Sequence, residues 1–163
     1  MIVVTGGAGF IGSNLIKKLN EMGCTDILVA DDLLDGTKVL NLADLDIRDY
    51  VHWTSLLKTL DGLVGSTKID CIFHQGAISA TTEWDGNLLM AQNYEYSKKL
   101  LHWCQIKKVP FIYASSASVY GNNTQFLEER HNERPINAYA FSKFQFDQYV
   151  RAIFRRTNIH SQI

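Results

Sequence analysis

Short apolar runs alternate with longer stretches of helical spacing along the chain. Runs of β-branched and aromatic residues predict buried strands at residues 2–5, 26–30, 69–74, 110–114 and 159–163. Apolar residues spaced three and four apart predict helices at residues 10–22, 51–63, 87–106 and 137–156. The more polar segments 33–45 and 121–136 indicate loops, with a turn at Asp35-Gly36.

The helical spacing also predicts which side chains enter the core. The first helix is expected to bury one face, made of Ile11, Leu15, Ile16 and Leu19. The third helix is expected to bury Leu89, Tyr96, Leu100, Leu101 and Cys104. Strands that alternate with helices predict an α/β fold, a doubly wound parallel sheet with helices on both faces. In such sheets ligands bind at the carboxyl ends of the strands.

Composition and charge exclude several kinds of partner. The 163 residues are enough for one domain spanning residues 1–163. The formal net charge of −1 gives no general attraction for nucleic acid or an anionic membrane. No apolar run approaches the roughly 18 residues that span a bilayer. We therefore expect neither nucleic acid nor a membrane as a partner.

The three cysteines, Cys24, Cys71 and Cys104, are widely spaced and odd in number. Such a set fits neither a disulfide framework nor a metal cluster. All three stand among apolar residues, which predicts buried, reduced thiols in a cytoplasmic protein.

A glycine-rich turn lies between the first strand and the first helix, in the sequence Thr-Gly-Gly-Ala-Gly-Phe-Ile-Gly at residues 5–12. Gly6 allows a tight turn, Gly9 lets a pyrophosphate approach the backbone, and Gly12 lets the helix pack on the strand. The helix N-terminus adds free N–H groups and a partial positive charge. No Gly-Lys-Ser/Thr follows, which argues against a P-loop nucleotidase.

An acidic residue, Asp31, ends the second strand about twenty residues after this turn, where a carboxylate binds the adenosine ribose of a dinucleotide. By itself Asp31 favours NAD, because it repels a 2′-phosphate. Lys38 could offset that repulsion by pairing with the phosphate, or it could be a solvated loop lysine. The residues alone leave NAD and NADP open.

A candidate acid–base set follows later in the chain. Tyr139 and Lys143 are one helical turn apart, and an ammonium at that spacing stabilises a phenolate that exchanges a proton with a substrate hydroxyl. Ser116 follows a strand, where its hydroxyl would bond the reacting oxygen; Ser115 and Ser118 are the alternatives. His74 is expected to be a packed or hydrogen-bonded residue rather than a base, and Gly76 and Ala77 after it would let a dinucleotide lie close.

These four elements, in this order, resemble the extended short-chain dehydrogenase/reductase family of nucleotide-sugar epimerases and dehydratases, which has a Rossmann-like fold. Segments 35–38, 79–86 and 93–98 further resemble the ADP-L-glycero-D-manno-heptose 6-epimerases. The resemblance implies an ADP-sugar substrate, epimerised by transient oxidation at C6, and NADP as cofactor, with NAD possible. It implies cofactor contacts at Phe10, Ile11, Asp31, Asp32, Lys38, Gln75, Gly76, Ala77, Ile78, Ser79 and Lys143.

Two departures from the family pattern concern the cofactor. Trp53 stands where the family often has a lysine near the adenine, and Gln92 stands where an asparagine often touches the cofactor, with Asn93 beside it.

Family members are roughly twice as long, so we expect a C-terminal substrate domain outside these residues and a homo-oligomer at full length. Another nucleotide-sugar 4-epimerase or dehydratase activity, or cofactor binding without activity, remains an alternative.

Overall fold

The computed structural model describes residues 1–157. Its first compact unit, Met1–Gly76 with Leu100–Ala114, contains one parallel sheet in the order β3-β2-β1-β4-β5. The strands are β1 (Ile2–Thr5), β2 (Ile27–Asp31), β3 (Asp49–His52), β4 (Cys71–His74) and β5 (Phe111–Tyr113). This order confirms the predicted Rossmann-like parallel sheet. It reverses direction between β1 and β4, which is where such sheets bind their ligands.

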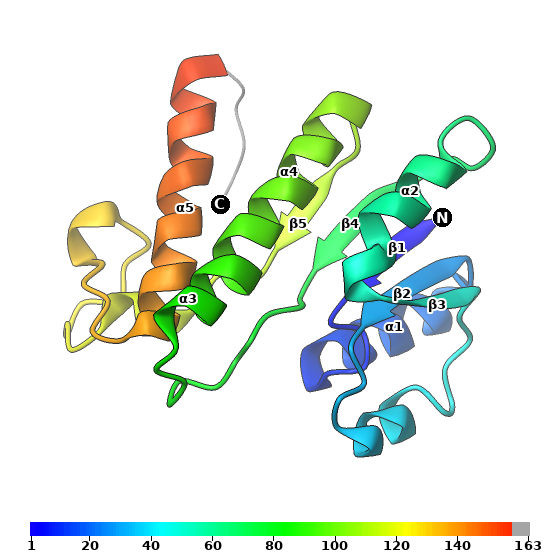
Figure 1. The fold of residues 1–163 in the computed structure, drawn as a ribbon, viewed down its shortest axis with the longest axis horizontal. Coiled ribbons are helices and arrows are strands. Elements are labelled where there is room, and N and C mark those ends of the chain that lie inside the picture. Colours follow the sequence, from blue (N-terminus) through cyan, green and yellow to red (C-terminus); the bar gives the residue numbers. More distant parts are fainter. Residues whose placement is uncertain (158–163) are drawn as a thin grey trace. The chain divides into compact units, whose positions relative to one another are not determined.

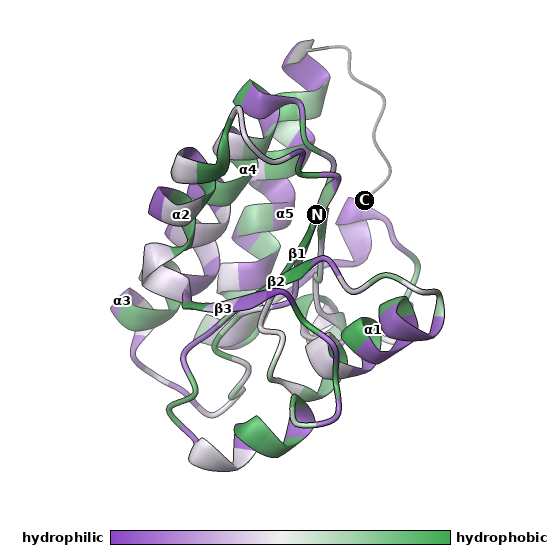
Figure 2. Cartoon of the chain, turned by 90° about the vertical axis from the view of Figure 1, so that its right-hand side faces the viewer, coloured by the Kyte–Doolittle hydropathy of each residue, from purple (hydrophilic) through white to green (hydrophobic). Residues whose placement is uncertain are grey.

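Helices cover both faces of this sheet, as predicted (Figure 2). The helix α1 (Phe10–Glu21) links β1 to β2 in one direction along the sheet, whereas α2 (Leu56–Leu63) links β3 to β4 in the other. Because parallel crossovers are right-handed, opposite directions place these helices on opposite faces. The helix α4 (Tyr96–Lys107) precedes β5, and its Trp103 Nε1–H donates to Asp61 Oδ1 of α2 at 2.8 Å.

The core of the unit contains side chains from the strands and from α1. Val4, Ile27, Val29 and Ile16 are fully buried against one another. Ile11, in contrast, was predicted to share the buried face of α1, and it is 63% exposed. The prediction was wrong because the buried residues of α1 are Gly12, Ser13 and Ile16, so Ile11 lies to the side of the face that is buried.

The edge strand β3 was not predicted. Helical spacing had indicated a single helix over residues 51–63, whereas the chain forms β3, a short 3₁₀ turn and then α2. Asp49 and His52 are exposed at the two ends of β3, so the strand has little apolar pattern of its own. Its pairing with β2, from Leu28 opposite Asp49 to Asp31 opposite His52, stabilises the extended form.

The second unit consists of Ala77–Lys99 and the chain from Ser115 onward. Its elements are α3 (Gly86–Leu89), the π-helical turn η3 (Met90–Glu95), the start of α4, the 3₁₀ turns η4 (Ala117–Tyr120) and η5 (Arg130–Asn132), and α5 (Ala138–Thr157). The helix α5 packs against α3, η3 and η4. Helices were predicted at 87–106 and 137–156, and both are confirmed. The strand predicted at 159–163 lies outside the described residues.

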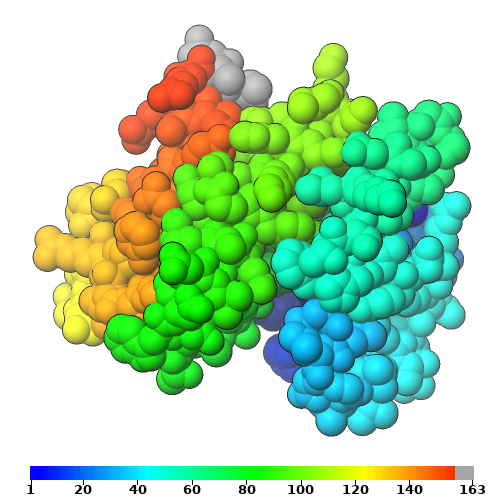
Figure 3. All heavy atoms as spheres, in the orientation of Figure 1, coloured from blue at the N-terminus to red at the C-terminus, as the bar shows by residue number. Residues whose placement is uncertain are grey.

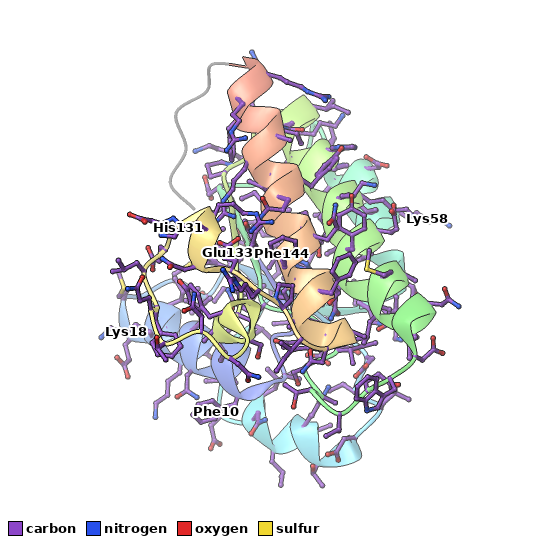
Figure 4. The ribbon with its side chains drawn as sticks, turned by 90° about the vertical axis from the view of Figure 1, so that its left-hand side faces the viewer. Phe10, Lys18, Lys58, His131, Glu133 and Phe144 are labelled. Carbon is purple, nitrogen blue, oxygen red and sulfur yellow. The ribbon has the colours of Figure 1, made fainter. Side chains whose placement is uncertain are left out.

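The loop between η4 and α5 is held by a buried ion pair. Glu133 is 5% exposed, and its carboxylate accepts hydrogen bonds from Arg151 Nη1 at 2.7 Å and Gln148 Nε2 at 3.0 Å, both on α5. Figure 4 shows Glu133 beside α5, near Phe144 of that helix. Gly121 starts the loop with a φ of +59°, and a Cβ there would overlap the carbonyl oxygen of Arg134.

The cysteines follow the prediction only in part. All three are free thiols, but Cys104 alone is buried, whereas Cys24 and Cys71 are half-buried. Burial raises the pKa of Cys104 to about 12, so it is not a reactive thiolate. Within residues 1–157, no helix is both long and apolar enough to cross a membrane, and no three His, Cys, Asp or Glu side chains group as metal ligands.

Candidate functional site

The glycine-rich turn connects β1 to α1 at the carboxyl edge of the sheet. Gly6 has a φ of +65°, a backbone conformation that favours glycine, and its N–H donates to Ala30 O at 2.7 Å. A Cβ at Gly12 would overlap the carbonyl oxygen of Gly6 and lie 2.7 Å from Gly7 Cα. Gly9 is the residue before the first turn of α1 and brings no capping side chain to it. The turn therefore presents bare backbone to any ligand.

A second glycine, Gly76, follows β4 and passes close to this turn. A Cβ at Gly6 would lie 2.6 Å from Gly76 Cα, and one at Gly76 would lie 3.0 Å from Gly6 N. The N–H groups of Gln75 and Gly76 donate to the carbonyl and the hydroxyl of Thr5, at 3.1 and 3.0 Å. The sequence suggested that Gly76 makes room for a dinucleotide. The structure shows that the two backbones already require a glycine there.

The acid at the end of β2 is tied to the same turn. Asp31 is 6% exposed, and its Oδ2 accepts a hydrogen bond from the N–H of Ala8 at 3.0 Å. Its Oδ1 accepts from the N–H of Asp32 at 2.8 Å and from Lys38 Nζ at 3.1 Å. Asn41 Nδ2 donates to Ala8 O at 2.8 Å and holds the turn from another side. Sequence reasoning missed Asn41, because nothing in the residue pattern relates it to the turn.

The position of Lys38 decides one alternative that the sequence left open. Its ammonium lies 3.1 Å from Asp31 Oδ1 and also 3.1 Å from Asp32 Oδ1, so it is not a solvated loop lysine. Burial lowers the pKa of Lys38, but the hydrogen bonds that its ammonium donates to Asp32 and Asp31, with the charges of these carboxylates, outweigh burial and raise the pKa above its ordinary value. Lys38 is therefore a permanent cation that neutralises part of the acidic cluster.

Two apolar side chains stand exposed at the start of α1. Phe10 is 83% exposed and lies at the surface (Figure 4), and Ile11 is 63% exposed. The segment between β2 and β3 is also at the surface of its unit (Figure 3), with Leu34 89% exposed and Leu40 74% exposed. Large exposed apolar side chains around a polar binding turn are typical of a ligand site.

His74 ends β4 as a packed residue rather than a base, as expected. It is 3% exposed, its Nδ1 lies 2.6 Å from Thr5 Oγ1, and its ring stacks on Phe111 at 5.7 Å. The Thr5 hydroxyl also accepts a hydrogen bond from Gly76 N–H, so it links the end of β4 to the glycine-rich turn.

The second unit holds the predicted acid–base set. Tyr139 and Lys143 lie one turn apart on α5 and are 9% and 7% exposed, which is unusual for a lysine. Ser116 precedes η4, and its Oγ accepts a hydrogen bond from the N–H of Ser118 at 3.2 Å. Because η4 packs against α5, the structure brings the serine segment and the Tyr139–Lys143 helix together.

Ser115 and Ser118, the two alternatives to Ser116, have other partners. The Ser115 hydroxyl donates to Asp147 Oδ2 at 2.5 Å, and Ser118 belongs to η4 itself.

Burial lowers the pKa of Lys143 to about 8, against the raising effect of the Asp147 charge. The ammonium therefore predominates at neutral pH and is lost as the pH rises past 8.

The remaining cofactor candidates, Ala77, Ile78, Ser79 and Gln92, are also in the second unit. Ile78 and Gln92 are half-buried, whereas Ala77 and Ser79 are exposed. Next to Gln92, the buried Asn93 holds this segment in place. Its Oδ1 accepts from Ile78 N–H at 2.8 Å, and its Nδ2 donates to Ile78 O at 3.0 Å and to Ser142 Oγ at 3.1 Å. An asparagine inside a helical pattern is the only sequence signal of this role.

Replacing Asn93 by leucine is expected to lower the free energy of unfolding by about 3 kcal/mol, because the N–H and C=O groups of Ile78 lose the buried side chain that pairs with both of them. Urea denaturation followed by circular dichroism measures the change. The control is Asn87→Leu, at an exposed asparagine of the same helical stretch, which should stay within about 0.5 kcal/mol of the parent protein. Equal losses in the two variants would contradict the bridging role of Asn93.

The first unit fits the pyrophosphate and ribose of a dinucleotide. The N-terminus of α1 offers backbone N–H groups and a partial positive charge, on a turn that side chains at Gly6 or Gly12 would fill. Asp31 supplies the carboxylate for a ribose, at the edge where the strand order reverses. The second unit separately supplies a buried phenol, ammonium and hydroxyl of the kind that transfer protons.

Comparison with known proteins decides the family. Residues 2–162 match the model of the NAD dependent epimerase/dehydratase family. The chain belongs to this family.

Several solved epimerases have similar structures. The ADP-L-glycero-D-manno-heptose-6-epimerase of Helicobacter pylori is 33% identical, with a TM-score of 0.81 over 93% of this chain and 50% of that one. The UDP-glucuronic acid 4-epimerase of Bacillus cereus, solved with UDP-glucuronic acid and NAD, is 26% identical, with a TM-score of 0.79 over 97% and 53%. The UDP-glucose 4-epimerase of Thermotoga maritima is 27% identical, with a TM-score of 0.78 over 97% and 52%. The chain spans about half the length of these proteins.

Proposed function

We propose that the protein epimerises ADP-D-glycero-D-manno-heptose to its L-glycero epimer by transient oxidation at C6, with NADP as cofactor. The observation that carries the reaction type is the buried Tyr139–Lys143 pair on α5, packed against the segment that follows Ser116. The substrate is supported by the heptose epimerase at 33% identity, compared with 26% and 27% for the two UDP-sugar epimerases.

In this mechanism Tyr139, as phenolate, accepts the proton of the C6 hydroxyl. A dinucleotide held at the turn after β1 would supply reversible hydride transfer at C6, and Tyr139 would return the proton when the ketone is reduced on its other face. The Lys143 ammonium stabilises the phenolate, and the Ser116 hydroxyl donates a hydrogen bond to the substrate oxygen. Because the hydride returns, the substrate undergoes no net oxidation.

Lys38 supports the choice of NADP. Asp31 and Asp32 together would repel a 2′-phosphate, but Lys38 places one positive charge against both carboxylates. A third of the Lys38 side chain is exposed, so the ammonium can also reach a ligand phosphate. The ribose argument alone favours NAD, but the positive charge of Lys38 reduces the repulsion that a 2′-phosphate would meet at Asp31 and Asp32.

Replacing Lys38 by alanine is expected to weaken NADP binding about 10-fold and to change NAD binding much less, because only NADP carries the phosphate that Lys38 would pair with. Isothermal titration with each dinucleotide measures the ratio. Lys18→Ala, at an exposed lysine of α1 that pairs with Glu21, is the matched control and should change neither affinity. Equal losses for NAD and NADP would contradict the phosphate role of Lys38.

Turnover of purified protein distinguishes the substrate classes. ADP-heptose, UDP-glucose and UDP-glucuronic acid are supplied separately, and the epimers are separated by chromatography. Heptose epimerisation alone supports the proposal, whereas preferred turnover of a UDP-sugar would replace it by a 4-epimerase. If the protein binds dinucleotide but turns over none of the three sugars, the result would favour the alternative that these residues bind cofactor without catalysing a reaction.

A further inference from the structure

A third buried polar side chain continues the line of Tyr139 and Lys143 along α5. Tyr139, Lys143 and Asp147 stand at positions i, i+4 and i+8 of α5, so they follow one another along the same side of the helix. Asp147 is 2% exposed, less than either of the other two. A buried carboxylate is costly unless it is hydrogen-bonded or paired with a cation, so its retention here requires partners.

One partner of Asp147 is the serine next to Ser116. The Ser115 hydroxyl donates to Asp147 Oδ2 at 2.5 Å, which is a short, charge-assisted hydrogen bond. This bond ties the chain just before η4 to α5. The Oγ of Ser116, the next residue, accepts from Ser118 N–H, so both neighbouring serines are fixed, one by the helix and one by the turn.

Lys143 interacts with Asp147 through charge. The negative charge of Asp147 acts on Lys143 and opposes the effect of burial on that ammonium. Nearby titratable groups include Tyr139 on α5 and Tyr120 on η4. Asp147 also acts on Tyr120, together with Glu133 and Arg151, but those two already form an ion pair with each other. Asp147 is therefore the carboxylate whose charge acts on the Lys143 ammonium and raises its pKa against the effect of burial.

We propose that Asp147 is a positioning residue for the acid–base set: its buried carboxylate holds Ser115, and thereby Ser116, against α5, and its charge keeps Lys143 as the ammonium that Tyr139 requires. The proposal rests on the proposed function for its catalytic consequence. The coupling of Asp147 to Lys143 is a property of the second unit alone.

The experiment compares Asp147→Asn, Asp147→Glu and Ser115→Ala with the parent protein. Glu95→Gln, which removes an exposed carboxylate paired with Lys98, is the control. The titration of Lys143 is followed by NMR of ¹³C-labelled lysine, with the signal assigned by its loss in Lys143→Arg. The pH dependence of heptose epimerisation and the affinity for NADP at pH 6 are measured on the same samples.

In Asp147→Asn, the titration midpoint of Lys143 and the alkaline limb of the rate profile are expected to move down together by about 1 pH unit. Asp147→Glu should restore both, and Glu95→Gln should move neither. Affinity for NADP at pH 6 should be unchanged, since Lys143 is an ammonium there in every variant. Ser115→Ala should lower kcat about 10-fold without moving the Lys143 midpoint, because it removes one charge-assisted hydrogen bond and no charge.

An unchanged Lys143 midpoint in folded Asp147→Asn would overturn the electrostatic part of the proposal, and full activity of Ser115→Ala would overturn the positioning part. If Asp147→Asn does not fold, Ser115→Ala still decides, because a wild-type rate in that folded variant would contradict the proposal. A parent protein that does not epimerise heptose, but whose Lys143 midpoint responds to Asp147, would instead contradict the proposed function.

Discussion

Replacement of Tyr139 by phenylalanine is expected to reduce epimerisation by about 10³-fold and to leave NADP affinity unchanged. The variant loses only the hydroxyl that accepts the substrate proton, and the ring remains packed in its buried place on α5. Steady-state turnover and dinucleotide titration measure the two effects separately. Since the ring is retained, we expect the variant to fold as the parent protein does.

Tyr149→Phe is the matched control, on the same helix. The Tyr149 ring lies edge-on to Tyr94 at 6.1 Å and beneath the Lys98 ammonium at 5.0 Å, and phenylalanine keeps both ring contacts. This variant should retain full activity. Normal turnover by Tyr139→Phe, or equal losses in the two variants, would exclude Tyr139 as the proton-transferring group.

Replacement of Gly12 by alanine is expected to lower the free energy of unfolding by about 3 kcal/mol and to weaken dinucleotide binding at least about 100-fold. The added methyl group would overlap the carbonyl oxygen of Gly6 and lie 2.7 Å from Gly7 Cα. Both contacts are with backbone, so α1 and the turn must separate, and the N–H groups that would bind the pyrophosphate move with them. Urea denaturation and isothermal titration with NADP measure the two losses.

Gly62→Ala is the corresponding control, because Gly62 lies inside α2 and a Cβ there meets nothing within 4 Å. Alanine favours the helix, so this variant should be equal to the parent in binding and up to about 1 kcal/mol more stable. Binding is compared at a temperature where circular dichroism shows both variants folded. Parent-like NADP affinity in folded Gly12→Ala would contradict the assignment of the turn to the dinucleotide.

Local chemistry made some features predictable from the sequence. The turn after β1 needs glycine where φ is positive and where the helix touches the strand, so its spacing of glycines is visible without a structure. Tyr139 and Lys143 are one helical turn apart wherever that helix lies. His74 was correctly expected to be packed, because it ends an apolar strand.

Features that depend on distant partners were not predictable. β3 exists because β2 offers it an open edge, and its own residues carry a weak pattern. Ile11 has an apolar side chain at helical spacing, yet it is exposed, because the helix buries the face that carries Gly12, Ser13 and Ile16. Asn93 looks like an ordinary polar residue until the backbone of Ile78, fifteen residues earlier, is placed against it.

The glycine-rich turn and the Tyr139–Lys143 spacing are thus properties that the sequence determines by itself, because glycine conformation and helical periodicity act over a few residues. Only the tertiary structure decided that Lys38 pairs with both Asp31 and Asp32, and that Asp147 accepts a hydrogen bond from Ser115. The strength of an ion pair or a hydrogen bond depends on the distance between its two partners in space and on how far they are buried. The linear order of residues specifies neither until the chain has folded.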